Sequence, residues 1–163
     1  MPKFRLKKRV SPCQAKVPKQ DTIPAFDPQT IRIQHITYYP SGSTYEGNEI
    51  TEEVVSKVLS EIPRGIEVCL SLDPYGEDNF LEVICGAGWL ALGCSSNGGQ
   101  ENYYSYNPAF AGTEELCPLT SGGQSPIEKY LAINDIEAGT AAAAYFIRTG
   151  RLYPCIDWAK QIG

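Results

Sequence analysis

The single histidine limits the catalytic chemistry that this chain of 163 residues can perform. With one imidazole, a histidine-paired nucleophile can form only at His35, and a metal site with several histidines cannot form at all. His35 also lies in the middle of an alternating, β-branched segment. That position is typical of a structural or surface histidine, so we expect no catalytic role for it.

Two adjacent acids, Glu77 and Asp78, are the next candidates for acid–base chemistry. They follow the turn-forming residues 73–76, where a solvated acidic cluster is the usual outcome. A paired-carboxylate enzyme is therefore kept only as a weak alternative. The acids at 73, 78 and 82 lack the spacing of a calcium loop, and the glycine pairs lack the lysine of a phosphate loop. We predict a protein that is not an enzyme and uses no cofactor or metal.

Six cysteines are present, and no two of them have the CxxC spacing of a zinc or redox site. Cys69, Cys85 and Cys94 fall in apolar runs, where a free cysteine behaves as a small buried hydrophobe. The N-terminus lacks the apolar stretch of a secretory signal, and no apolar run approaches the roughly 20 residues of a membrane span. We therefore expect reduced thiols, a cytoplasmic location and no membrane association.

Three tyrosines lie close together at Tyr103, Tyr104 and Tyr106. In a strand, a period of two places Tyr104 and Tyr106 on one face and Tyr103 on the other. Core packing explains one of these faces. The other face is either further core or a contact surface, since tyrosine is favoured at interfaces.

The elements that must position these residues are predicted from periodicity and turn signals. Thr51 is expected to cap a helix that Pro63 ends, and Asn134 a second helix that stops at Gly150. The expected strands are residues 30–39, 66–72, 80–85, 89–94 and 102–106, with 151–158 as a last edge strand. A long, turn-rich connection is expected over 107–133. The predicted fold is α+β, an antiparallel meander sheet of about four to five strands packed by two helices.

Charge divides the chain into two parts. Residues 1–20 hold seven of the 14 Lys and Arg and no acid, so residues 21–163 carry a net −12. Residues 1–29 are also rich in proline, which removes backbone donors and disfavours regular elements. We predict a basic, proline-rich tail over 1–29, mobile or strapped to the surface, and a single α+β domain over 30–163.

The basic tail also suggests a nucleic-acid arm, because seven positive charges could neutralise several phosphates. No DNA- or RNA-binding motif accompanies them, however, and the acidic body would repel a duplex. Nucleic acid is therefore not the expected partner. An adaptor whose tail binds nucleic acid or another acidic partner stays open as the alternative function.

The order of residues over about 50–163 resembles a family of bacterial immunity proteins, the one numbered first among those of polymorphic toxin systems. The resemblance rests on Gly88-Trp89-Leu90-Ala91-Leu92, on Tyr-Tyr-Ser-Tyr-Asn-Pro, and on an alanine-rich helix followed by Thr149-Gly150-Arg151-Leu152-Tyr153-Pro154 and Asp157-Trp158. It implies a small cytoplasmic antitoxin, often paired with a toxin of the nucleic-acid deaminase fold. Trp158 matches the family signature and is interpreted as a structural anchor.

The resemblance implies that the chain binds and sterically blocks a cognate bacterial toxin, a deaminase or a nuclease. Such a toxin must grip phosphate, and its inhibitor needs an acidic face, which the body can supply. The oligomeric state is not predicted. The expected partner-binding residues are acids on two loops together with the tyrosines: Asp73, Glu77, Asp78, Glu82, Glu101, Tyr103, Tyr104, Tyr106, Glu114 and Glu115.

Overall fold

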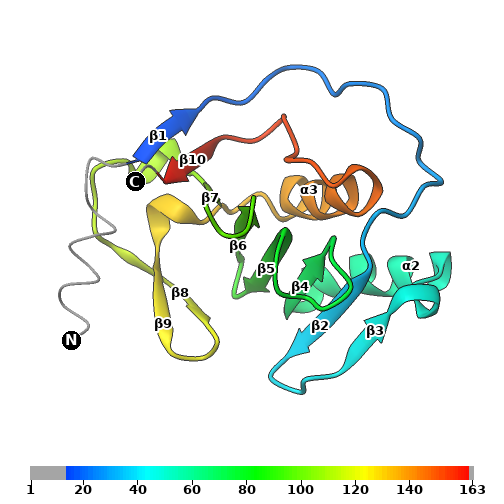
Figure 1. Cartoon of the computed structure of the whole chain (residues 1–163). Coiled ribbons are helices and arrows are strands. Elements are labelled where there is room, and N and C mark those ends of the chain that lie inside the picture. Colours follow the sequence, from blue (N-terminus) through cyan, green and yellow to red (C-terminus); the bar gives the residue numbers. More distant parts are fainter. Residues whose placement is uncertain (1–13, 162–163) are drawn as a thin grey trace.

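The computed structural model describes residues 14–161, and residues 1–13 and 162–163 lie outside the described part. Figure 1 shows one large sheet with two helices on one face and a separate hairpin on the other. Eight strands pair antiparallel in the order β1-β10-β7-β6-β5-β4-β2-β3. The strands of this sheet are β1 (Gln14–Val17), β2 (His35–Tyr39), β3 (Thr44–Glu46), β4 (Ile66–Ser71), β5 (Phe80–Gly86), β6 (Trp89–Ser96), β7 (Glu101–Ser105) and β10 (Trp158–Gln161).

The α+β class and the central meander agree with the sequence prediction. Strands β4, β5, β6 and β7 are consecutive in the chain and pair in that order. The turn between β5 and β6 is tight because Ala87 and Gly88 both adopt positive φ, as a two-residue hairpin requires. The predicted size of the sheet is wrong, because eight strands pair where four or five were expected. The additional strands β1, β3 and β10 are only three or four residues long, too short for a clear alternating pattern.

The two helices begin and end for reasons visible in the sequence. Helix α2 (Glu52–Glu61) begins where the hydroxyl of Thr51 accepts a hydrogen bond from the backbone N–H of Val54. Helix α3 (Ile136–Thr149) ends at Gly150, whose φ of 72° is the left-handed conformation that closes helices. The predicted cap of α3 is wrong by one residue: Asp135 caps it, and Asn134 donates its amide to the carbonyl of Gly88.

The main core lies between the helices and one face of the sheet. It joins Val55 and Val58 of α2 and Phe146 of α3 to inward-facing residues of the central strands. Trp158 belongs to the same core, is 2% exposed, and donates its indole N–H to the carbonyl of Tyr153. Burial with a satisfied polar group agrees with the anchoring role expected for this tryptophan.

Part of the predicted tail belongs to the sheet. The expectation that residues 1–29 hold no regular element is wrong for residues 14–17, which form β1 and pair with β10. Residues 18–34 then pass over the helix side to reach β2 at the far side of the sheet (Figure 1). Phe26 meets the Tyr145 ring of α3 edge-on at 5.2 Å, and Arg32 donates its N–H to the carbonyl of Ile147. The described part of the tail is therefore a strap on the surface.

Two further predictions are corrected by the strand pairing in the structure. The segment 107–133 contains a β-hairpin, formed by β8 (Leu116–Ser121) and β9 (Ser125–Glu128). Pro118 and Pro126 lie within these strands, and proline is tolerated in a two-stranded ribbon that pairs with no further strand. The last strand is Trp158–Gln161 and lies between β7 and β1, so it is not an edge strand.

The predicted strand over residues 30–39 is shorter in the structure, because β2 begins at His35. Residues before it bond to α3 and to the carbonyl of Ser71 outside the regular ladder. Within residues 14–161, neither helix has the length and apolar character needed to cross a membrane.

Candidate functional site

The face of the sheet turned away from the helices carries most of the polar side chains of the central strands. Residues directly opposite one another in neighbouring antiparallel strands point to the same face. The register therefore places one line of side chains across five strands on this face. We call it the cross-strand row, and it consists of Thr37, Cys69, Glu82, Gly93 and Tyr104. All five residues are half-buried, so the row is accessible from outside.

The β8–β9 hairpin covers one side of this row. Cys117 and Leu119 of the hairpin strand β8 pack on Ile84 and Ala91 of the sheet and form a second small core. The turn of the hairpin is tied down as well, because the backbone N–H of Gly122 donates to a carboxylate oxygen of Glu67 at 2.8 Å. The hairpin is thus held over the sheet at both its strand and its tip.

The acidic loop 73–79 covers the β2 side of the same face. The Asp73 carboxylate accepts hydrogen bonds from the backbone N–H groups of Tyr75, Glu77 and Asp78, at 3.2, 3.0 and 2.9 Å. Partial burial by itself would raise the pKa of Asp73, but these hydrogen bonds together outweigh it and lower the pKa. Asp73 therefore organises the loop.

His35 lies beneath this loop and is 8% exposed. A methyl group placed on Gly76 would lie 2.8 Å from Nδ1 of His35, so the loop backbone packs directly on the imidazole ring. The same Nδ1 lies 3.2 Å from the hydroxyl of Thr37. The loop, strand β2 and the cross-strand row are thereby held in one arrangement.

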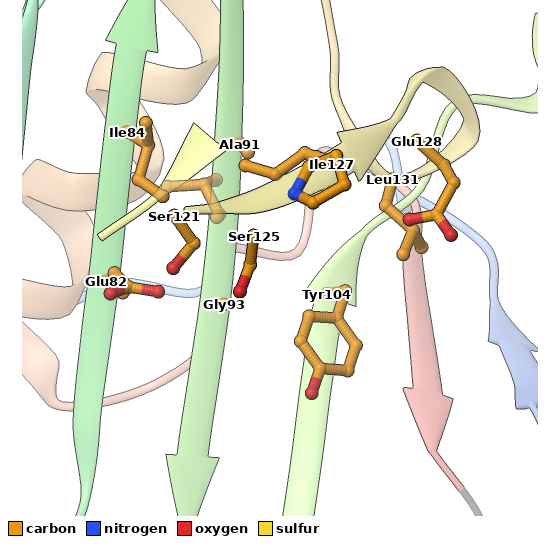
Figure 2. Close-up of a pocket in the computed structure, with 12 residues that line it drawn as sticks. Glu82, Ile84, Ala91, Gly93, Tyr104, Ser121, Ser125, Ile127, Glu128 and Leu131 are labelled. Atoms are coloured by element: carbon orange, nitrogen blue, oxygen red, sulfur yellow. The ribbon is translucent and has the colours of Figure 1, made fainter. Parts of the chain in front are cut away.

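A groove opens between the hairpin and the sheet, with a volume of about 210 Å³. Figure 2 shows Ser121 and Ser125 of the hairpin extending toward the region that also holds Glu82, Gly93 and Tyr104. The groove is lined by Glu82, Ile84, Ala91, Leu92, Gly93, Tyr104, Ser121, Ser125, Pro126, Ile127, Glu128 and Leu131. The lining contains two glutamates and no lysine or arginine.

Glu82 is a polar group of the groove whose pKa is shifted by its surroundings. Burial raises the pKa of the Glu82 carboxyl, and the nearby Glu67 carboxylate raises it further. No described residue donates a hydrogen bond to Glu82 or forms an ion pair with it. The groove thus holds a half-buried carboxylate without a counter-charge from the described chain, which is unfavourable for the isolated protein.

Gly93 makes room in the floor of the groove. It stands directly between Glu82 and Tyr104 in the register. A methyl group placed there would lie 3.6 Å from Cδ1 of Tyr104, an ordinary contact distance. The missing side chain therefore leaves a hollow beside the ring that a small substitution could fill.

The structure brings together only some of the predicted partner-binding residues. Glu82 and Tyr104 share the groove, and Glu77 and Asp78 are exposed on the loop of the same face. Tyr103 is on the helix side, where it packs on the main core beneath the Lys160 ammonium. The remaining predicted residues lie as follows: Asp73 inside its loop, Glu101 half-buried at the start of β7, Tyr106 buried, and Glu114 and Glu115 exposed before the hairpin, with Glu115 paired to Lys129.

Other residues of this face were not predicted from the sequence. Tyr75 is 79% exposed at the tip of the acidic loop, and a tyrosine within an acidic turn was a signal that could have identified it. Ser121 and Ser125 line the groove, and Gly122 bonds to Glu67, only because the hairpin folds back over the sheet. No local pattern in the sequence signals that contact.

The cysteines within residues 14–161 are free thiols. Burial raises the pKa of Cys69 and of Cys94 to about 11, so both are almost wholly protonated near neutral pH. Cys13 lies outside the described residues, as do the basic residues of the first 13 positions. Among the described residues, no three His, Cys, Asp or Glu side chains group as metal ligands would.

No protein-family model matches the chain, and no curated protein matches it. The resemblance to the immunity family therefore stays a prediction, and the functional argument rests on the residues and the geometry described above.

Proposed function

We propose that this chain is an immunity protein that binds a cognate bacterial toxin and sterically blocks it. The toxin is one that acts on nucleic acid, a deaminase or a nuclease, and the contact is made by the acidic face of the sheet. The observation that carries the proposal is the arrangement of this face. A groove containing Glu82, which has no ion-pair partner among residues 14–161, and an exposed acidic loop lie on one side of the sheet, while helices close the other side.

Charge supports a partner with a basic surface. Residues 21–163 carry a net −12, and a protein that grips phosphate presents a basic cleft. Complementary fields raise association rates by roughly 10- to 1,000-fold, and salt screens them over about 8 Å at physiological ionic strength. Fast capture suits a protein that protects the cell in which the toxin is made.

The test begins with the product of the gene immediately upstream, as the candidate toxin. Co-purification and loss of toxin activity at equimolar ratio are the expected results. Stopped-flow association at several salt concentrations then measures how much electrostatic attraction accelerates binding. The on-rate is expected to fall as salt rises, whereas the dissociation rate changes less because buried contacts are short-range.

Two double charge-reversal variants distinguish the effect of charge in the acidic loop on the association rate from the effect of net charge. The double variant Glu77→Lys, Asp78→Lys alters the acidic loop without removing Asp73, which holds that loop together. The control Glu53→Lys, Glu137→Lys makes the same change in net charge on exposed positions of the two helices. We expect the first pair to slow association more than the second. An on-rate that is independent of salt and equal in both variants would overturn the proposal.

The adaptor alternative predicts a different result. Binding to DNA that weakens with salt, and that is lost when the basic residues at 3–9 are replaced, would favour an adaptor over an immunity protein.

A further inference from the structure

The shape and lining of the groove limit what can occupy it. Its volume of about 210 Å³ is below the roughly 300–1,000 Å³ of pockets that hold cofactors or drug-sized ligands. It is open on one side and faces the same direction as the acidic loop. The volume of the groove therefore matches a single long side chain of a bound protein.

The chemistry of the lining requires an occupant with two different parts. Ile84 and Ile127 form apolar walls, which favour a hydrocarbon stem. Glu82 offers a carboxylate that no described residue pairs, so the end of the occupant must carry a positive charge. A wholly apolar side chain would bury that carboxylate further without compensation, and an anionic one would be repelled by both Glu82 and Glu67.

The number of acceptors distinguishes between the two common cationic side chains. The hydroxyls of Ser121 and Ser125 extend from the hairpin toward the region of Glu82 (Figure 2). Arginine supplies five N–H donors in a planar fork and pairs with carboxylates in a bidentate manner, whereas lysine supplies three donors at one point. The carboxylate and the two hydroxyls therefore offer hydrogen-bond acceptors at several points, which the planar guanidinium can bond to at once and the compact ammonium of lysine cannot.

We propose that the groove receives one arginine side chain of the partner protein, with its guanidinium at Glu82 and its stem against Ile84 and Ile127. The identity of the partner rests on the proposed function, but the groove's preference for a guanidinium does not. Glu82 would then be the central contact of the interface. Pairing also removes the cost of the isolated carboxylate, so that the unfavourable feature of the free protein is relieved on binding.

The experiment uses the full chain and small probes, so it needs no toxin. Nα-acetyl-arginine amide is titrated at millimolar concentration while the backbone amide signals of Gly93, Tyr104 and Ser125 are followed by NMR. The control probes are the citrulline analogue, which has the same shape without the charge, and the lysine analogue. We expect the arginine probe to shift these signals, the lysine probe to bind more weakly, and the citrulline probe to have no effect.

Two variants test the site itself. Glu82→Gln is expected to weaken the arginine probe by about tenfold or more, while Glu53→Gln on the exposed face of α2 leaves it unchanged. Gly93→Val keeps the carboxylate but fills the hollow beside Tyr104, and it is also expected to abolish the shifts. Thermal melting of each variant establishes that it is folded.

Other outcomes would overturn the proposal. Equal binding of arginine and citrulline, or of arginine and lysine, would show that the groove does not select a guanidinium. Tighter probe binding after Arg5→Gln, Arg9→Gln would identify the chain's own N-terminal segment as the occupant, and a dimer that depends on Glu82 would identify a second copy.

Toxin binding separates this inference from the proposed function. A toxin bound equally well by wild type and Glu82→Gln would overturn the arginine site and leave the immunity function standing. Probe binding without any toxin binding would support the site and count against the immunity function.

Discussion

Glu67 of β4 and Gly122 of the hairpin turn are joined across the open face of the sheet by a hydrogen bond of 2.8 Å. The donor is a backbone N–H and the acceptor is a carboxylate, so the bond is charge-assisted. Within residues 14–161, no other hydrogen bond joins the hairpin turn to the sheet. The width of the groove therefore depends on a side chain that does not itself line it.

Replacing Glu67 should loosen the hairpin tip. In Glu67→Ala we expect faster hydrogen exchange of residues 120–125, with a local loss of about 1 kcal/mol. Protection of the strands β8 and β9 near Cys117 should change less, because the small core beneath them is intact. Glu53→Ala, which removes an exposed acid from α2, is the control. Unchanged exchange at the tip in Glu67→Ala would show that the tether does not hold the hairpin.

Neutralising Glu82 should stabilise the free protein at a pH above the folded-state pKa of this carboxyl. The folded-state pKa of Glu82 is raised above its ordinary value by burial and by Glu67. The folded protein therefore binds this proton more tightly than the unfolded chain does, so the contribution to stability is complete below the unfolded pKa and is lost as pH rises through the folded pKa. At a pH above the folded-state pKa this contribution is gone, and we expect Glu82→Gln to melt at a higher temperature than wild type there.

The control for this prediction is the same comparison at low pH. Below the ordinary glutamate range both proteins are neutral at position 82, so their melting temperatures should converge. A lower melting temperature for Glu82→Gln above the folded-state pKa would show that the carboxylate is stabilising in the free protein, contrary to the interpretation of the groove.

Tyr104 and Tyr106 should behave differently when truncated, although both lie near the same face. Tyr104 is half-buried in the groove wall, so Tyr104→Ala should keep its fold and speed dissociation of the partner. The loss of binding free energy should be about 2 kcal/mol for a central contact. Tyr106 is 9% exposed and packs with Tyr130 and Leu131. Tyr106→Ala should instead cost about 3 kcal/mol of unfolding free energy. Chemical denaturation and dissociation kinetics separate the two effects, and equal losses of stability would contradict this assignment.

Gly139 in α3 should not tolerate alanine. A methyl group there would lie 2.5 Å from Cδ2 and 2.6 Å from Cδ1 of Leu90 in β6. In an open helix this substitution stabilises by roughly 0.5–1 kcal/mol, but overpacking a core costs about 1–3 kcal/mol, so the net effect should be destabilising. Denaturant unfolding measures it. The double variant Gly139→Ala, Leu90→Val should recover part of the loss, and a more stable Gly139→Ala single variant would show that the helix can move away.

Thiol reactivity should follow burial and pKa. With a pKa of about 11, Cys69 presents roughly one thiolate in a thousand at pH 8, and Cys94 is both similar in pKa and buried. Cys155 is half-buried, and we expect it to be alkylated first among the described cysteines. Mass spectrometry after timed iodoacetamide treatment measures the order in which the cysteines are alkylated. Rapid labelling of Cys94 in the native protein would indicate opening of the sheet.

Elements whose signals lie within a short segment were predictable from the amino-acid sequence. Thr51 and Gly150 mark a helix start and a helix end because their capping bonds involve residues within one turn. The meander from β4 to β7 was predictable because each strand pairs with its neighbour in the chain through a short turn. The separation of Tyr103 from Tyr104 followed from the period of a strand alone, and the acidic character of the body from counting charges.

The set of residues that share the groove follows from the packing of distant segments. Glu82, Gly93 and Tyr104 form a line because of the pairing register of three strands, which no single segment specifies. The hairpin with Ser125 joins them because its apolar residues are buried against the outer face of the sheet, a contact that depends on area removed from water and not on adjacency in the chain. The same reason explains why β10 lies inside the sheet: its backbone donors and acceptors are satisfied by β7 and by β1, a strand from the other end of the chain.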